Sequence, residues 1–374
     1  MEGSALERPW AHLATLGSPT TAAAANSADA VISGLGCNSS GRRELKRNPG
    51  RRVVATQQPC PETWLETRLI GVLLAARSRS VRRFRVMATS EAAPPEPYTM
   101  LLRCPLVRAG TPGSCSLHID YGRQHDRKPH RDDERNLGGA WLAATEKNPR
   151  IFDGSKFRLH RIALDAHDHV VLELGLTGYR EYLGTNRLPT EALRQLEADG
   201  RAEHADPRAH LSDALGCETI LLTADDQVVL LRRSSSVATH SGLHNGPSGH
   251  PEPSRAGVDT AGAQGAAAAA AVLRELYDSV LQETHEETAV PRDALSEPQL
   301  IGCMADGVGK PDLLFLTRTT LDADGVRACY SQGPEEGWES DRLVFWPAQT
   351  LTECTLALTP VTRAAIACFV PLRE

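Results

Sequence analysis

Three glutamates within five residues, Glu283, Glu286 and Glu287, are the feature that most constrains this 374-residue chain. In a helix of 3.6 residues per turn, these three positions project from one face. Repulsion between carboxylates at this spacing costs roughly a few tenths of a kcal/mol per pair, and a bridging divalent cation would reverse it. Oxygen ligands of this kind suit Mg²⁺ or Mn²⁺ better than zinc. The spacing is equally compatible with an ordinary solvated helix face, so it leaves both interpretations open.

The residues before the glutamates predict a long helix with one apolar side. An alanine block, Ala266–Ala271, precedes them, and alanine is the best helix former, so the block is expected to extend the start of this helix. An apolar stripe would bury one side of the helix and turn the carboxylates toward a cleft. The stripe consists of Val272, Leu276, Val280 and Leu281.

Apolar periodicity elsewhere predicts strands and helices in no regular βαβ repeat, which favours an α+β fold. Strands are predicted at 98–106, 157–165, 169–176, 217–223, 228–231, 299–304, 312–317 and 342–346, and helices at 132–147, at 190–199 and from Thr359-Pro360 onward.

The first 97 residues differ in charge from the remainder, with 13 Lys and Arg against 8 Asp and Glu, which leaves a net charge of −11 on the rest of the chain. Residues 1–86 are rich in Ala, Ser and Arg, and three interpretations stay open. They are an organellar transit peptide, or a disordered extension, or they are a gene-model artefact and translation starts at Met87. The expected compartment is therefore intracellular, either cytoplasmic or organellar.

Composition argues against two classes of partner. Nucleic-acid binding calls for a basic stripe, and the part after residue 97 is acidic. A membrane span needs roughly 20 apolar residues, and no run in the sequence approaches that length. We therefore expect neither a nucleic acid nor a membrane as partner, and the oligomeric state stays open.

Cysteine and histidine spacing gives no metal or disulfide framework. The nine cysteines contain no Cys-x-x-Cys pair, so buried reduced thiols are expected. His118, His125 and His130 lie in a polar stretch without ligand spacing and are expected to be surface residues.

The segment Arg274–Val290 resembles the Nudix box, the metal-binding motif of the Nudix hydrolases. The three glutamates match its acidic positions, and Val290 matches its last apolar position. The chain also departs from the box at several positions. These are Gln282 for Arg, Thr284 for an apolar residue, Ala289 for Gly, and Arg274 in place of an upstream Glu, with Glu275 one residue out of register.

Other stretches make the resemblance closer and extend it from about Tyr98 to the C-terminus. Among them are Leu174–Arg180, Leu231–Ser234 and the glycine-containing loop Gly246–Pro253. In this order they resemble the uridine diphosphate glucose pyrophosphatase branch of the family. That branch implies a Nudix α/β/α sandwich over 211–374, a smaller N-terminal α/β subdomain over 98–210 that contributes to substrate binding, and an appended extension over 1–97.

The resemblance implies Mg²⁺-dependent hydrolysis of the pyrophosphate bond of UDP-glucose, and of UDP-galactose, to UMP and the sugar 1-phosphate. It places the metal, Mg²⁺ with Mn²⁺ as substitute, on Glu283 and Glu287, with Glu286 as a third catalytic carboxylate. Which carboxylate acts as general base stays open. Contacts to the nucleotide sugar are implied at Phe152, Tyr179, Arg233, Ala238, Asn245, His250 and Glu252.

Two alternatives remain at this point. One is a Nudix hydrolase of another nucleoside diphosphate derivative, such as ADP-ribose. The other is a catalytically weak nucleotide-sugar-binding module, because the box Arg, Glu and Gly are missing. Two loop positions also differ from the branch: Asn245 replaces Asp, and Ser248 replaces a glycine, which raises the question of whether the backbone there needs a positive φ.

Overall fold

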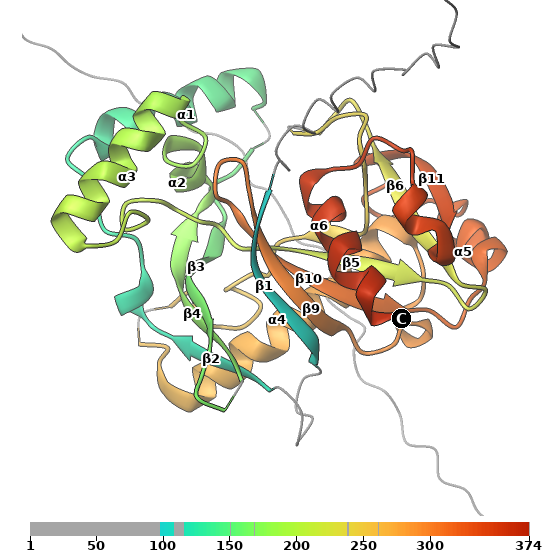
Figure 1. Cartoon of the computed structure of the whole chain (residues 1–374). Coiled ribbons are helices and arrows are strands. Elements are labelled where there is room, and N and C mark those ends of the chain that lie inside the picture. Colours follow the sequence, from blue (N-terminus) through green and yellow to red (C-terminus); the bar gives the residue numbers. More distant parts are fainter. Residues whose placement is uncertain are drawn as a thin grey trace, which may run out of the picture. The chain divides into compact units, whose positions relative to one another are not determined.

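The computed structural model describes residues 98–107, 116–149, 151–167, 169–237, 239–260 and 262–373 (Figure 1). All of these belong to one unit, Arg85–Glu374. The extension before Tyr98, and with it the transit-peptide interpretation, lies outside the described residues. None of the helices in the described ranges has the length and apolar character that crossing a membrane requires.

The larger of the two sheets contains eight strands. In chain order they are β1 (Tyr98–Val107), β5 (Gly216–Leu222), β6 (Gln227–Arg233), β7 (His244–Asn245), β8 (Ser248–Gly249), β9 (Gln299–Asp306), β10 (Pro311–Arg318) and β11 (Ser340–Pro347). Their order across the sheet is β1-β9-β10-β5-β6-β11, with β7 paired to β6 and β8 to β5 (Figure 1). Only the β10–β5 pair is parallel among these described pairs.

Six α-helices accompany the sheets in the described residues. They are α1 (Asp133–Lys147), α2 (Tyr179–Gly184), α3 (Thr190–His204), α4 (Gly265–Thr288), α5 (Ala323–Tyr330) and α6 (Pro360–Phe369). Short 3₁₀ helices lie at Arg123–His125, Arg292–Ala294, Ala348–Glu353 and Val370–Leu372.

Helices cover both faces of the large sheet because its central strands alternate in side-chain direction. On β10, Leu313 and Phe315 pack in one core cluster with α4, whereas Leu314 and Leu316 pack in another cluster with α6. The result is the α/β/α sandwich that the family resemblance implies, and the α+β prediction is confirmed.

The smaller sheet has three strands, β2 (Leu117–Tyr121), β3 (Ser155–Leu164) and β4 (Val170–Gly178), in the order β2-β4-β3. Leu172 and Leu174 of β4 join the same core cluster as Val272 and Leu276 of α4. Helix α4 is therefore held by both sheets, and this fixes the element that carries the three glutamates. The alanine block does extend this helix, as predicted.

Strand β1 belongs to the predicted N-terminal subdomain by sequence but pairs with β9 of the large sheet. Strands β2 to β4 form a sheet of their own. The boundary at 210/211 stays a prediction.

Among the strands and α-helices of the described residues, five were not predicted: β2, β7, β8, α2 and α5. Helix α3 also runs to His204 instead of ending at 199. The end at 199 was predicted too early because Gly200 resembles a helix terminator in sequence. In the structure Gly200 is buried within the helix, and a Cβ there would lie 2.7 Å from the Asp206 carbonyl oxygen. The helix ends instead at Ala205, in the left-handed conformation with φ 57°.

The expectation of surface histidines is wrong for two of the three. His125 is 7% exposed and His130 is 8% exposed, whereas His118 is exposed on β2. The chain after β2 folds back onto β4, where a Cβ on Gly175 would lie 2.4 Å from the His125 carbonyl carbon. Cys217, Cys303, Cys329, Cys354 and Cys368 are free thiols, and Cys217, Cys303 and Cys368 are buried, as expected.

Two phenylalanines with opposite environments test this packing. Phe315 is fully buried under α4, whereas Phe152 is 73% exposed. We expect Phe315→Ala to lower the free energy of unfolding by about 3–5 kcal/mol through lost burial and the cavity left behind. The matched Phe152→Ala change should alter it by no more than about 0.5 kcal/mol. Urea unfolding followed by circular dichroism gives both values, and equal losses would contradict the assigned core.

Candidate active site

The C-terminal half of α4 presents its carboxylates to a pocket. Glu283 and Glu286 line it, whereas Glu287, one residue further along, is only 3% exposed. Residues from the loop after β8, from α4 and from the loop before β11 complete the lining: His250, Glu252, Arg255, Glu275, Ser279, Gln282 and Glu336. The predicted cleft beside the acidic helix is therefore present.

Glu336 is a functional candidate that the sequence did not reveal. Carboxylate oxygens of Glu283, Glu287 and Glu336 lie within 4.8 Å of one another. The Glu336 backbone N–H donates to the Glu286 carbonyl oxygen at 2.9 Å, which fixes this loop on the end of α4. In the sequence, the acidic run around position 336 was the only sign of a functional residue, and it did not indicate that Glu336 lies next to the glutamates of α4.

The three carboxylates of this trio crowd one another: Glu287 is buried, and Glu283 and Glu336 are partly buried. Burial, followed by the charges of Glu336 and Glu286, raises the pKa of Glu283 to about 8. Burial, followed by Glu339 and Glu286, raises the pKa of Glu336 to about 7. Burial and the Glu283 carboxylate raise the pKa of Glu287 well above its ordinary value. Such crowding is stable only if the charge is neutralised, by protons or by a cation.

The donor set fits a hard divalent cation. Oxygen Oε2 of Glu287 is buried and has no hydrogen-bond partner among the described residues. A buried carboxylate oxygen without a donor is costly, and a metal ion supplies the missing interaction. All three groups offer oxygen, so the trio suits Mg²⁺ or Mn²⁺ and not a site for soft ligands.

Gly249 allows the loop after β8 to close against the helix. A Cβ at this position would lie 1.9 Å from a carboxylate oxygen of Glu283, so only glycine fits. The next residue, His250, donates its backbone N–H to the same carboxylate at 3.3 Å. Ser248, by contrast, does not adopt a positive φ, so its replacement of a glycine causes no backbone strain.

The departures from the box have local compensations. Gln282 stands in place of Arg, and its amide donates to the Glu286 carboxylate. Arg292 in turn donates to the Gln282 oxygen at 3.1 Å, and Arg255 lies 4.0 Å from the Glu286 carboxylate. Positive charge is thus supplied by neighbours and not by position 282 itself.

The displaced upstream glutamate also has a clear role. Glu275 is buried and accepts a hydrogen bond from the Glu252 backbone N–H at 2.9 Å, whereas Arg274 is exposed. The register shift seen in the sequence therefore still provides a carboxylate that holds the loop on the helix.

Several of the predicted substrate residues lie at or near this site. His250 and Glu252 line the pocket, and Lys156 of β3 pairs with Glu252 at 3.5 Å. Asn245 is buried in β7 and donates to the Ser248 hydroxyl at 2.9 Å. Arg233, at the end of β6, is close enough for its charge to lower the pKa values of Glu287 and Glu339, against the raising effect of burial.

The remaining predicted contacts are not among the pocket-lining residues. Phe152 is exposed in the segment before β3, and Tyr179 begins α2, where its ring lies edge-on to Trp141 at 6.5 Å. The Tyr179 backbone N–H donates to the Gly154 carbonyl oxygen at 3.2 Å, so these two segments are joined to each other. Ala238 lies outside the described residues.

An acidic helix, a glycine loop closed over it and an α/β/α sandwich together frame a candidate site whose oxygen donors fit a divalent cation. The sequence relatives identify the family. "Uridine diphosphate glucose pyrophosphatase NUDT22" of Mus musculus is 34% identical over 278 residues, which covers 72% of this chain and 89% of the relative. The Homo sapiens protein of the same name is 35% identical over 280 residues, covering 72% and 90%. "Nudix hydrolase 9" of Arabidopsis thaliana is 31% identical over 261 residues, covering 66% and 81%.

The chain therefore belongs to the Nudix hydrolase family. Hydrolases of this family generally need a divalent metal ion, usually Mg²⁺. No protein-family model matches the chain. Among solved structures, a MutT protein from Methanosarcina mazei Go1 shows a TM-score of 0.28 and 14% identity, covering 43% of this chain and 94% of that one. The family assignment rests on the sequence relatives.

A side chain at position 249 should disrupt the carboxylate cluster. We expect Gly249→Ala to displace Glu283 and weaken Mn²⁺ binding at least about tenfold, because a displaced ligand loses its geometry. Gly307→Ala is the control, since a Cβ there meets nothing within 4 Å. Electron paramagnetic resonance of free Mn²⁺ measures both affinities, and an unchanged affinity in Gly249→Ala would contradict the close approach.

Neighbouring glutamates test the assignment of Glu336. Glu336→Gln keeps the side-chain size but removes one oxygen ligand and its charge, so Mn²⁺ affinity should fall at least about tenfold. Glu335→Gln, at an exposed adjacent position, should leave it within about twofold. If the two variants bind Mn²⁺ equally well in the same titration, Glu336 is not part of the site.

Proposed function

We propose that this chain hydrolyses the pyrophosphate bond of UDP-glucose, and also of UDP-galactose, to UMP and the sugar 1-phosphate in a Mg²⁺-dependent reaction. The observation that carries the proposal is the crowded carboxylate trio Glu283, Glu287 and Glu336 beside the pocket that the His250 loop closes. The relatives named as UDP-glucose pyrophosphatases support the choice of substrate.

Each carboxylate has a proposed role. Glu283 and Glu287 hold Mg²⁺, with Mn²⁺ as substitute, and Glu336 is a further ligand. When bound, the ion neutralises phosphate oxygens and lowers the pKa of the attacking water. Glu286, held by the Gln282 amide at the pocket wall, is placed to accept a hydrogen bond from water or to act as general base.

A cationic side of the site is placed to receive the pyrophosphate. Burial, followed by the charges of Lys310 and Lys156, lowers the pKa of His250 well below its ordinary value. The neutral imidazole therefore stands near two ammonium groups, and Arg233 adds a third cation near Glu287. We propose that phosphate oxygens lie between these cations and the carboxylate trio, where a guanidinium can pair with two oxygens at once.

The uracil contacts are proposed outside the pocket wall, and the sugar and ribose contacts at or beside it. Phe152 is 73% exposed, which leaves its ring available to stack on a base, and Tyr179 lies on the segment joined to it. Asn245 and Glu252 offer hydrogen bonds to hydroxyl groups. Ala238 is kept as a contact on the family resemblance alone.

Product analysis on a substrate panel tests the reaction. With Mg²⁺, UDP-glucose and UDP-galactose should give UMP and sugar 1-phosphate, detected by chromatography, and chelator should abolish the reaction. Glu287→Gln should lower kcat/KM by about 10²–10³-fold, equivalent to about 3–4 kcal/mol of transition-state stabilisation. Glu335→Gln serves as the control of matched chemistry.

The same panel separates the alternatives. Faster turnover of ADP-ribose than of either UDP-sugar would replace the substrate assignment with another nucleoside diphosphate derivative. Tight UDP-glucose binding in calorimetry, with no product and no effect of Glu287→Gln, would instead indicate a nucleotide-sugar-binding module.

Substitution of the exposed aromatic tests base recognition. Phe152→Ala should raise KM for UDP-glucose about tenfold with little change in kcat, because one stacked base contributes about 1–3 kcal/mol. Leu142→Ala is the control, since Leu142 is 61% exposed on α1. An unchanged KM in steady-state kinetics would remove Phe152 from the substrate site.

A further inference from the structure

A second group of metal-binding side chains lies at the end of α3. His130, from the segment before α1, and His210, from the loop after α3, are both buried, and their rings meet edge-on at 4.9 Å. Glu203 stands in the last turn of α3. Ligand atoms of these three residues lie within 4.8 Å of one another.

The hydrogen bonds of His210 define its tautomer and leave one ring nitrogen unused. Its Nδ1 lies 2.9 Å from the Lys128 carbonyl oxygen, which can only accept, so Nδ1 carries the proton. Nε2 of the neutral ring is then a lone pair. It is buried, has no hydrogen-bond partner in the described part of the chain, and lies 3.4 Å from Oε2 of Glu203. Two acceptors thus face each other with no donor between them.

His130 brings a ring nitrogen within 4.8 Å of the ligand atoms of His210 and Glu203. The Asp132 backbone N–H donates to its Nδ1 at 3.2 Å, so Nε2 carries the proton and donates to Asp199 at 3.1 Å. A cation would replace that proton, and Asp199 would keep its second partner, Arg131, at 2.9 Å. Donation from the outer ring nitrogen to a backbone carbonyl, as in His210, is the usual way that proteins orient a metal-bound imidazole.

We propose that Nε2 of His210, Nε2 of His130 and the Glu203 carboxylate form a binding site for Zn²⁺. Two imidazoles and one carboxylate are typical zinc ligands, unlike the all-oxygen trio of the active site, and water completes the tetrahedron. The Glu203 side chain is 44% exposed, which opens a path for the ion from solvent. Arg131 contacts Oε1 of Glu203 at 3.4 Å, whereas the oxygen that faces His210 is Oε2.

Binding of the ion joins three separate segments: the end of α3, the loop after it and the residues before α1. The proton displaced from His130 leaves to solvent. The site adds stability to this region in the presence of zinc.

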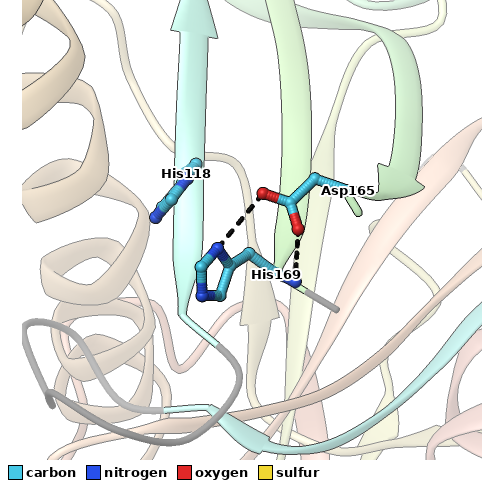
Figure 2. A group of neighbouring side chains, drawn as sticks. All are labelled: His118, Asp165 and His169. Carbon is cyan, nitrogen blue, oxygen red and sulfur yellow. Dashed lines mark hydrogen bonds and ion pairs between the residues drawn. The ribbon is translucent and has the colours of Figure 1, made fainter. Parts of the chain in front are cut away.

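Another histidine cluster provides the internal comparison. Figure 2 shows His118, Asp165 and His169, whose potential ligand atoms also lie within 4.8 Å of one another. There, the groups are already paired: Nδ1 of His169 lies 3.1 Å from Asp165 (Figure 2), and His118 is hydrogen-bonded to the Ser116 hydroxyl at 2.9 Å. Because no buried nitrogen in it lacks a partner, this cluster serves as the control.

Titration of the full chain with Co²⁺, in excess Mg²⁺, tests the proposal, because tetrahedral Co²⁺ absorbs strongly in the visible range and octahedral Co²⁺ does not. We expect a tetrahedral spectrum at one Co²⁺ per chain, which stoichiometric Zn²⁺ abolishes. Glu203→Gln should weaken binding at least about 100-fold, since loss of a direct ligand exceeds loss of an outer partner. Asp165→Asn and Glu287→Gln should leave the spectrum unchanged.

Thermal unfolding without metal checks that Glu203→Gln is folded, and added Zn²⁺ should raise the unfolding temperature of the unmodified chain but not of this variant. Absence of the tetrahedral spectrum in the unmodified chain would overturn the proposal. So would its loss in Asp165→Asn, or its full retention in Glu203→Gln.

Discussion

The close approach between the Gly249 backbone and the Glu283 carboxylate is the contact on which the rest of the site depends. Strand β8 fixes Gly249 by pairing it with Cys217 of β5, and the buried stripe of α4 fixes Glu283. The approach is so close that one added methyl group at position 249 would overlap the Glu283 carboxylate and displace it. The sheet and the helix therefore hold the Glu283 carboxylate in a partly buried position, where its charged form loses hydration.

The rigidity of α4 explains how three crowded carboxylates stay together. Val272 and Leu276 anchor the helix between the large and small sheets, and the Glu336 backbone N–H closes the loop before β11 onto its end. Ligands carried on such an element keep their geometry without the cation, which reduces the reorganisation needed to bind it. The rigid helix keeps the carboxylates close together, and a bound divalent cation would offset their repulsion.

How far the sequence predicts this site depends on the distance along the chain between partners. The three glutamates of α4 share one helix, so their common face follows from periodicity alone, and the family resemblance added His250 and Glu252. Glu336 could not be predicted as a partner of these glutamates. It lies about fifty residues further along the chain, and the loop that follows α5 brings it next to α4. Local spacing carries no information about such a contact.

The same limit explains the histidines. His125 and His130 sit in a polar stretch, and polar stretches are usually exposed. Their burial comes from the return of the chain onto β4 and α3, where backbone and carboxylate groups replace water. The box departures show the opposite case. Arg292 and Arg255 supply the positive charge that the missing box Arg would bring, and Glu275, one residue out of register, takes the place of the upstream Glu.

Two neighbourhoods of different ligand chemistry thus occur on one chain, an all-oxygen trio on α4 and a nitrogen-rich cluster at α3, and the catalytic account depends on the first. Crystals soaked in Mn²⁺ test it most directly through anomalous diffraction. The account predicts a peak bound by the carboxylates of Glu283, Glu287 and Glu336, at bond lengths of about 2.0–2.2 Å. A site without such a peak, in which the carboxylates share protons with one another, would contradict it.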